Sequence, residues 1–338
     1  MSTSTTSPSD SPKRGQTPFR RVRGRFAPTP SGRMHLGNAF SALVAWLSAR
    51  AAGGEMVLRI EDLDPRAANR ERAELLIEDL RWLGLDWDEG PYWQSERGEV
   101  YAQALARLAD AGLTYPCFCT RAELHAASAP HASDGTPVYA GTCRGLSAEG
   151  VARRSTVRPP ATRLCVPDAD DPAGTIEFRD LAYGPRREVL ARECGDFLVR
   201  RSDGVVAYQL AVVVDDALMG VTQVVRGRDL LSSCARQIYL GGLLGYEPPE
   251  YGHVPLLVAP DGRRLAKREK DLDLGALRAR GVRPERVVSA LARAAGLAEP
   301  GWEGSAAELV PLFSWDRIAA RRDDIVVDDA FLARLLAR

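Results

Sequence analysis

The chain has 338 residues, 45% of them hydrophobic and 27% charged, which is enough for one large domain with a smaller one attached or for two ordinary domains. Its 45 Lys and Arg residues balance its 45 Asp and Glu residues, so bulk charge favours no nucleic-acid partner, which would have to meet a local basic face. No stretch approaches the roughly 20 apolar residues of a membrane helix, and we expect no membrane partner.

The first 24 residues are rich in Ser, Thr and Pro and lack the apolar core of a secretory signal. We therefore expect a disordered tail over residues 1–24. Without an export signal we expect a cytoplasmic, reducing compartment. The six cysteines are then expected to be thiols or metal ligands, not disulfides.

The next segments alternate between expected strands and helices. Arg25–Gly32 reads as a short strand that breaks into a turn, and Asn38–Arg50 has the apolar spacing of a helix. Glu55–Ile60 is a compact apolar run, typical of a buried parallel strand. A helix should start at Asp64–Pro65 and another should cover Glu99–Ala111. This order predicts the α/β class with a parallel sheet.

Cysteines, histidines and turn residues interrupt this pattern between Tyr115 and Gly145. The later expectations, in chain order, are mixed short strands over 163–182, a strand buried on both faces over 205–216 (VVAYQLAVVVDD), a helix over 228–245 ended by Gly245, a strand at HVPLLV, and mostly helical structure after 274.

Three motifs carry candidate chemistry, and the first is APTPSGRMHLGN, Ala27 to Asn38. A glycine-flanked turn there leads into a helix start, where free N–H groups can bind phosphate. His35 can donate to a phosphate oxygen, and Gly37 lets a flat ring approach the backbone. The alternative is a Pro/Gly turn that only reverses the chain.

The second motif is the basic loop Arg263–Arg268, RRLAKR, which could close over a triphosphate or remain a solvated loop. The third is RIEDLDP, Arg59–Pro65, whose acidic residues follow a buried strand. Open α/β sheets bind ligands at the carboxyl ends of their strands. Helix capping by Asp62 or Asp64 is the alternative.

In combination, H-x-G-N early in the chain and the x-L-x-K-x loop late resemble the two signatures of class I aminoacyl-tRNA synthetases. RFAPTPSGRMHLGN, RIEDLDP, LGLDWDEGPYWQSER, DFLVRRSDGVVAYQLAVVVDD and VVRGRDLL narrow the resemblance to the glutamyl-tRNA synthetase subgroup, over about residues 25–270. It implies a Rossmann-type catalytic domain in two halves, 25–114 and 196–273. Between them lies a small zinc-bearing insertion, 115–195, and a short helical C-terminal stub follows, 274–338, with no anticodon-binding domain.

The resemblance implies that a glutamate carboxylate attacks the α-phosphate of ATP, which arrives with Mg²⁺, to give glutamyl-adenylate and pyrophosphate. Such chemistry depends on positioning and on stabilising charge. The implied catalytic residues are His35 and Lys267, and the implied ATP-binding residues are His35, Gly37, Asn38 and Lys267. Ala266 stands where the family loop usually carries serine, so we expect reduced but retained activation.

The resemblance also implies a glutamate pocket. Arg25 and Arg226 should face the substrate carboxylates and Glu61 its ammonium group, which suits a diacid with one amine. The implied pocket is completed by Phe26, Ala27, Pro28, Thr29, Ser31 and Tyr208. A surface pair of Arg226 with Asp229 and a core position for Tyr208 are the alternatives.

Cys117, Cys119 and Cys143 leave a tetrahedral metal site one ligand short. His125, His131 and Tyr139 are candidates for the fourth position, and general chemistry would favour histidine. C-x-C followed by Y-x-x-x-C resembles the glutamyl-Q tRNA(Asp) synthetases, which implies a structural zinc ion on Cys117, Cys119, Tyr139 and Cys143. Packed thiols without metal are the alternative, as we expect for Cys165, Cys194 and Cys234.

The short chain and the cysteine pattern both resemble this family, which activates glutamate without tRNA and esterifies it onto the queuosine base at the wobble position of tRNA(Asp). The expected partners are L-glutamate, ATP and tRNA(Asp), with the protein a monomer. The alternatives are a truncated synthetase charging the 3′ end of tRNA(Glu) and an inactive paralogue that binds RNA. Candidate phosphate-binding clusters are Arg153–Arg154, Arg200–Arg201 and Arg278–Arg286.

Overall fold

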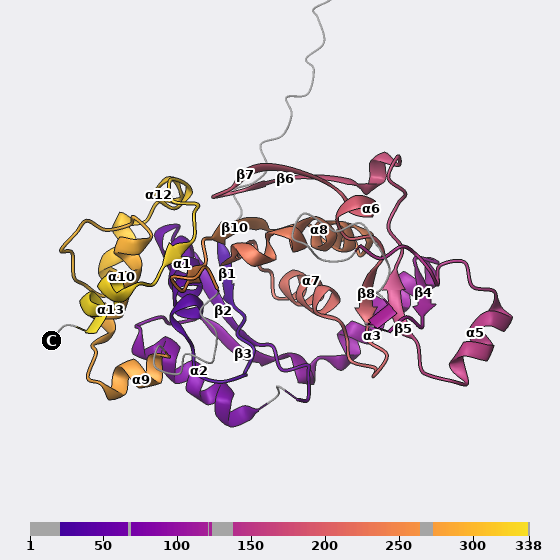
Figure 1. The fold of residues 1–338 in the computed structure, drawn as a ribbon, viewed down its shortest axis with the longest axis horizontal. Helices are drawn as coiled ribbons and strands as arrows, with labels where there is room; N and C mark the ends of the chain where they lie inside the picture. Colours follow the sequence, from indigo (N-terminus) through magenta and orange to yellow (C-terminus); the bar gives the residue numbers. More distant parts are fainter. Residues whose placement is uncertain (1–20, 67–68, 121, 124–137, 264–272, 337–338) are drawn as a thin grey trace, which may run out of the picture.

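The computed structural model describes residues 21–66, 69–120, 122–123, 138–263 and 273–336 (Figure 1). Strands β1 (Arg23–Phe26), β2 (Glu55–Ile60) and β3 (Glu89–Trp93) pair in parallel. Strand β9 (Gln223–Gly227) pairs in parallel with β10 (Glu250–Val254). The amide of Thr222 donates to the carbonyl of Arg23 at 2.9 Å, so these two sheets meet between β9 and β1. The predicted α/β class with a parallel sheet is confirmed.

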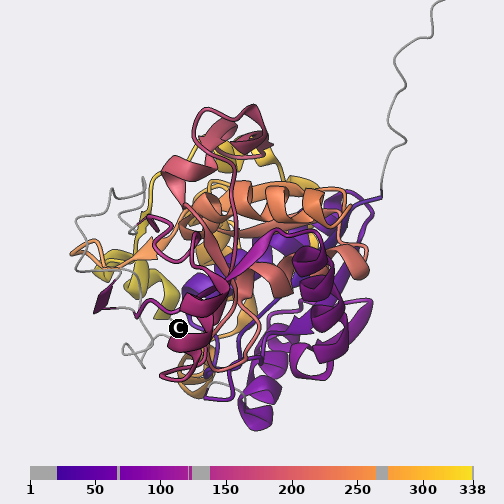
Figure 2. The ribbon, with the colours of Figure 1, turned by 90° about the vertical axis from the view of Figure 1, so that its right-hand side faces the viewer.

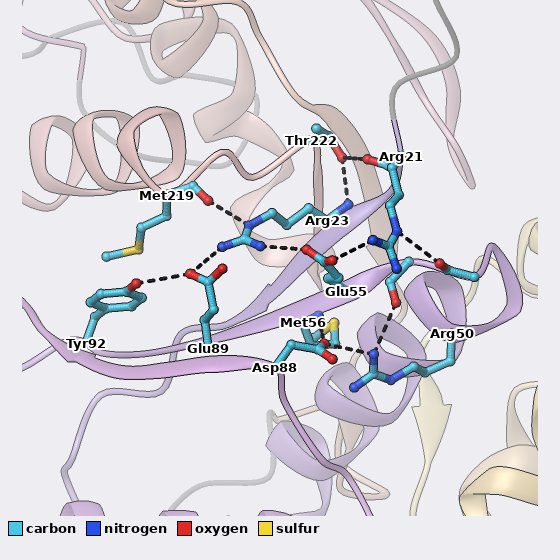
Figure 3. A network of polar contacts seen from close by, with 12 residues as sticks. Arg21, Arg23, Arg50, Glu55, Met56, Asp88, Glu89, Tyr92, Met219 and Thr222 are labelled. Atoms are coloured by element: carbon cyan, nitrogen blue, oxygen red, sulfur yellow. Dashed lines mark hydrogen bonds and ion pairs between the residues drawn. The ribbon is translucent and has the colours of Figure 1, made fainter.

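Arg23 on β1 links neighbouring strands of the sheet through its side chain (Figure 3). Its guanidinium pairs with Glu55 on β2 and with Glu89 on β3, each at 2.7 Å. The same group donates to the carbonyl of Met219, which precedes β9, at 2.8 Å. Because β1 begins at Arg23, residues 21–24 of the expected tail belong to the folded domain. Residues 1–20 lie outside the described residues.

The helices of the central domain are α1 (Leu36–Ala51), α2 (Arg70–Trp82), α3 (Gly98–Asp110), α7 (Tyr208–Leu218) and α8 (Cys234–Leu243), with short turns η1 (Gln94–Glu96) and η3 (Arg228–Ser233). Helix α1 is buried along nearly its whole length. It lies between β1 and β9 on one side and the C-terminal segment on the other, which explains why most of its residues are apolar.

The segment with the cysteines forms a small antiparallel sheet of β4 (Thr114–Cys117), β5 (Ala161–Leu164) and β8 (Phe197–Arg200), with helix α5 (Ala148–Ser155) beside it. Figure 2 views the molecule from this end. Between β5 and β8 run η2 (Pro172–Gly174), β6 (Thr175–Asp180), β7 (Gly184–Val189) and α6 (Leu190–Glu193). Strand β6 pairs in parallel with β10, so part of the expected insertion completes the central sheet. The division at residues 114 and 195 stays a prediction.

The C-terminal segment packs against α1 and β10, at the end of the molecule opposite the cysteines (Figure 1). As expected it is mostly helical, with α9 (Leu274–Ala279), α10 (Pro284–Ala294), α11 (Ala306–Leu309), η5 (Val310–Leu312), α12 (Trp315–Ala319) and α13 (Asp329–Leu336). A short strand β12 (Ile325–Val326) pairs with β11 (Leu257–Val258). The Trp315 indole donates to Ser48 Oγ of α1 at 2.9 Å and lies over Gly252 of β10, which docks the segment.

Two expectations about elements were wrong. The run 205–216 forms helix α7 from Tyr208, not a strand. Its apolar residues are buried on several faces, so the run had no helical periodicity to separate it from a buried strand. Helix α2 begins at Arg70, not at Asp64–Pro65, because the Asn69 side chain caps it by accepting from the amide of Arg72 at 2.9 Å.

Within the described ranges, no helix combines the length and apolarity that crossing a membrane requires.

Candidate active site and cysteine cluster

A cavity of about 500 Å³ lies at the carboxyl ends of β1, β2 and β9. Open α/β sheets ordinarily bind their ligands at the carboxyl ends of the parallel strands. Its lining includes every described residue predicted for the glutamate and ATP sites: Arg25, Phe26, Ala27, Pro28, Thr29, Ser31, His35, Gly37, Asn38, Glu61, Tyr208 and Arg226. Lys267 and Ala266 lie outside the described residues.

Two buried guanidinium groups form the cationic part of this cavity. Arg25 is the next-to-last residue of β1, is 6% exposed, and donates to the carbonyl of Val225 at 3.0 Å. Burial lowers the pKa of Arg25, but a guanidinium stays charged at any physiological pH. Arg226 is the next-to-last residue of β9 and is only 4% exposed, so it does not lie at the surface. The expected alternative of a surface pair for Arg226 therefore fails.

Glu61 supplies the carboxylate at the same place, directly after β2. Fully buried Arg59 donates to Glu61 Oε1 at 3.1 Å and to Asp216 Oδ1 at 2.6 Å. Burial raises the pKa of Glu61, although the charges of Arg59 and Arg25 oppose that rise. Arg25, Arg226 and Glu61 thus present two cations and one partly compensated anion to a ligand.

The residues that hold this arrangement were not singled out from sequence. Asp215 on α7 is fully buried and accepts from Gln94 at 2.7 Å, Arg97 at 2.6 Å and Tyr101 at 2.8 Å. Together with Asp216 it surrounds Arg59 with negative charge. The consecutive aspartates at the end of an apolar run were the available signal, because buried carboxylates require partners.

His35 is the N-cap of α1. Its Nδ1 accepts from the amides of Gly37 at 3.1 Å and Asn38 at 3.3 Å, so its proton must be on Nε2. In this structure those two amides therefore donate to the imidazole, whereas the sequence had suggested that N–H groups at this helix start are free to bind phosphate. A Cβ at position 37 would lie 3.1 Å from the His35 ring, which explains the glycine.

Tyr208 is 37% exposed, which rules out the core position considered from sequence. It also lines a second cavity of about 700 Å³ that runs toward the cysteines and includes Cys119, Tyr139, Arg154 and Arg236. The first turn of α7 therefore stands between the two cavities.

The four predicted metal ligands lie together. The Sγ atoms of Cys117, Cys119 and Cys143 all lie within 4.8 Å of one another. The Tyr139 hydroxyl lies 3.4 Å from Cys117 Sγ and 3.7 Å from Cys119 Sγ. Three sulfurs and one oxygen thus converge from β4 and the segment after it, which is the donor number of a closed structural zinc site. His125 and His131 lie outside the described residues.

Two N–H groups beside this cluster favour negative charge on Tyr139 and Cys117, whereas burial raises the pKa of Tyr139 and raises the pKa of Cys119 to about 11. The Cys143 amide donates to the Tyr139 hydroxyl oxygen at 2.9 Å, and Arg163 Nε donates to Cys117 Sγ at 3.3 Å. Arg163 also lies 3.7 Å over the Tyr139 ring. All six cysteines are free thiols; of the three expected in the core, Cys234 is buried, whereas Cys165 and Cys194 are half-buried.

Comparisons with known proteins give consistent results. Residues 21–304 match the family model for class I tRNA synthetases (E and Q), catalytic domain. The glutamyl-Q tRNA(Asp) synthetase of Symbiobacterium thermophilum is 53% identical over 87% of this chain and 93% of its own length. The synthetase of the same name from Nitratidesulfovibrio vulgaris is 52% identical over 82% and 87%.

Among solved structures, a glutamate tRNA ligase from Elizabethkingia meningosepticum in complex with its amino acid matches with a TM-score of 0.76 and 26% identity. The match covers 92% of this chain and 68% of that one. The fold around the cavity is therefore shared with an enzyme whose structure holds an amino acid.

Proposed function

Because this chain belongs to the class I tRNA synthetases of the E and Q type, and within them to the glutamyl-Q tRNA(Asp) synthetases, we propose that it activates L-glutamate with ATP and transfers it to the queuosine base of tRNA(Asp). The structural observation that carries the proposal is one cavity lined by Arg25, Arg226, Glu61 and His35. Glutamate has two carboxylates and one ammonium group, so it matches two cations and one anion.

In the first step Arg25 and Arg226 bind the two carboxylates, and Glu61 binds the ammonium group. The α-carboxylate then attacks the α-phosphate of ATP, which brings Mg²⁺ as part of the substrate, and pyrophosphate leaves. His35 donates from Nε2 to a phosphate oxygen and so stabilises the charge that develops there. Lys267, outside the described residues, is proposed for the same task. No side chain becomes covalently modified, so positioning accounts for the rate.

In the second step a hydroxyl of the queuosine ring attacks the carbonyl of glutamyl-adenylate, and AMP leaves. Tyr208 stands where the two cavities adjoin, so the proposed route for the nucleotide runs from the second cavity past this side chain.

We further propose that Cys117, Cys119, Tyr139 and Cys143 hold one zinc ion with a structural role. The convergence of the four donor atoms and their buried surroundings support this assignment. The ion would fix the loop between β4 and β5 and supply rigidity, because closed four-ligand sites leave no position for substrate.

The deciding experiment measures pyrophosphate exchange without tRNA and then transfer of labelled glutamate to tRNA(Asp). We expect exchange with tRNA absent, and transfer to tRNA(Asp) that carries queuosine but not to tRNA(Asp) with guanosine at the wobble position. Transfer should survive removal of the terminal 3′ adenosine. Label that requires this adenosine on tRNA(Glu) would instead indicate 3′-end charging, and no adenylate under any condition would indicate an inactive RNA-binding paralogue.

A further inference from the structure

Two buried polar residues outside the cavity lining are linked to Arg226, and sequence analysis did not single them out. His253 on β10 and Asp180 at the end of β6 are both completely buried. His253 Nδ1 lies 2.6 Å from Asp180 Oδ2, and His253 Nε2 lies 3.1 Å from Arg226 Nε. Hydrogen-bond contacts thus link the three side chains in series, from Asp180 on β6 through His253 on β10 to Arg226 on β9.

The direction of these hydrogen bonds follows from Arg226. A guanidinium can only donate, so His253 Nε2 must accept and carry no proton. The imidazole proton is then on Nδ1 and is donated to Asp180. Burial lowers the pKa of His253, and the charge of Arg226 lowers it further against the effect of Asp180, which agrees with a neutral ring. Only one tautomer of His253 fits its neighbours.

Asp180 is itself held in place by the backbone. Its Oδ1 accepts from the amides of Ala182 and Tyr183, each at 2.9 Å. Burial alone would raise the pKa of this carboxyl, but the hydrogen bond from His253 and the two amides outweigh burial and leave the pKa below its ordinary value. The carboxylate oxygen that faces His253 is thus fixed as an acceptor.

The remaining nitrogens of Arg226 show what this line of contacts leaves for a ligand. Nη2 donates to the carbonyl of Leu230 at 3.1 Å and to Cys234 Sγ at 3.2 Å. Nη1 is buried and has no hydrogen-bond partner among the described residues. An unpartnered buried donor is costly unless a ligand completes it, and Arg226 lines the glutamate cavity.

We propose that His253 and Asp180 are positioning residues, which orient the Arg226 guanidinium through Nε so that Nη1 is presented to a substrate carboxylate. This inference rests on the proposed function, in which Arg226 binds glutamate. The orientation of the guanidinium depends on which nitrogen of His253 carries the proton. With that proton on Nε2, the N–H groups of His253 and Arg226 would face each other and the guanidinium would turn.

The test is Asp180→Asn, which keeps the side-chain volume but moves the His253 proton from Nδ1 to Nε2. The amides of Ala182 and Tyr183 need an oxygen at Oδ1, so the new NH₂ group faces His253 Nδ1 and donates to it. The ring proton is then forced onto Nε2, opposite Arg226. We expect the Kd for L-glutamate, measured by calorimetry without ATP or tRNA, to rise about tenfold or more, while KM for ATP changes less than about twofold.

Asp196→Asn is the matched control, because Asp196 is also buried and accepts from Tyr115 and from the Val166 amide near the cysteines. It should leave the glutamate Kd within about twofold of wild type. A wild-type protein that binds no glutamate would refute the proposed function itself. A wild-type protein that binds glutamate, together with an unchanged Kd in Asp180→Asn, would overturn the positioning role alone.

A second pair of variants decides the matter if Asp180→Asn does not fold. His253→Gln keeps an acceptor oxygen near the Nε2 position, whereas His253→Ala removes it. We expect the glutamine variant to bind glutamate at least about fivefold more tightly than the alanine variant. Equal binding by the two variants would overturn the inference.

Discussion

Glu61 is the carboxylate that lies with the buried Arg25 and Arg226 in the lining of the cavity proposed for glutamate, so its substitution should act on the ammonium group of the substrate. Glu61→Gln keeps the shape and removes the charge. We expect KM for glutamate in pyrophosphate exchange to rise about 10- to 100-fold, which corresponds to loss of about 1.5–3 kcal/mol for a charged hydrogen bond. Exposed Glu99 on α3 offers the matched control, since Glu99→Gln should change nothing. An unaltered KM in Glu61→Gln would remove this residue from the binding site.

The same residue predicts how binding depends on pH. Burial raises the pKa of Glu61 above its ordinary value of 4.5, despite the opposing charges of Arg59 and Arg25. On acidification Glu61 therefore takes up a proton at a higher pH than an exposed glutamate and loses its attraction for the ammonium group. We expect the Kd for glutamate to rise as the pH is lowered from 8 to 5, with the rise starting above pH 4.5. In Glu61→Gln the Kd should stay nearly constant over that range. Parallel profiles for the two proteins would contradict this origin.

At the scale of elements, the contact between β10 and α12 is tight enough to test by one methyl group. A Cβ at Gly252 would lie 2.3 Å from the Trp315 ring, so Gly252→Ala must displace the indole that docks the C-terminal segment. We expect about 1–3 kcal/mol of destabilisation in urea unfolding. A Cβ at Gly242, in helix α8, would meet nothing within 4 Å, so Gly242→Ala should be neutral or stabilising by up to about 1 kcal/mol. Equal effects of the two variants would mean that the indole contact is dispensable.

Helix α5 is the most accessible of the three arginine clusters proposed to meet phosphates. Arg153 and Arg154 are both exposed in its last turns. Arg153→Glu with Arg154→Glu should weaken tRNA(Asp) binding about 5- to 50-fold and flatten its dependence on salt, because fewer counterions are released. Adenylate formation needs no tRNA contact and serves as the internal control. Tight tRNA binding with the wild-type salt slope would place the phosphate contacts elsewhere.

Elements whose sequence pattern reflects one physical cause were predictable. The run Glu55–Ile60 has a parallel strand on each side, and Asn38–Arg50 lies within a helix. The run 205–216 was not predictable, because a helix packed on several faces shows no periodicity. The start of α2 was misplaced because Asp64 and Asn69 are both good caps, and the choice depends on contacts distant in sequence: Asp64 accepts from Arg66 and Arg201 instead.

At the scale of the whole molecule, the proposed zinc ion should separate the two half-reactions. Cys143→Ser removes one of the four converging donors, and we expect the zinc content measured by metal analysis to fall from about one ion per chain to near zero. Transfer to tRNA(Asp) should fall about tenfold or more, while tRNA-independent adenylate formation stays within about twofold. Cys165→Ser, outside the three converging thiols, should retain the metal. Wild-type protein purified without chelators and free of zinc would refute the site.

The residues that line the candidate site were predictable. Arg25, Glu61 and Arg226 lie in separate segments, and the motifs that contain them predicted one shared pocket; in the structure all three line one cavity. What holds them could not be predicted in the same way. Asp215 and Asp180 act on side chains that are remote in sequence, and only the folded chain brings such partners together.

Strand β6 has a consequence for building chimaeras from relatives of this chain. Its last residue, Asp180, belongs to the glutamate side, although the strand follows the cysteine-bearing loops in the chain. A transplant of residues 115–195 would therefore exchange a buried partner of Arg226 along with the cysteine-bearing segment. A crossover between β5 and β6 would keep Asp180 and His253 from the same parent. A hybrid joined there should retain the glutamate affinity of that parent.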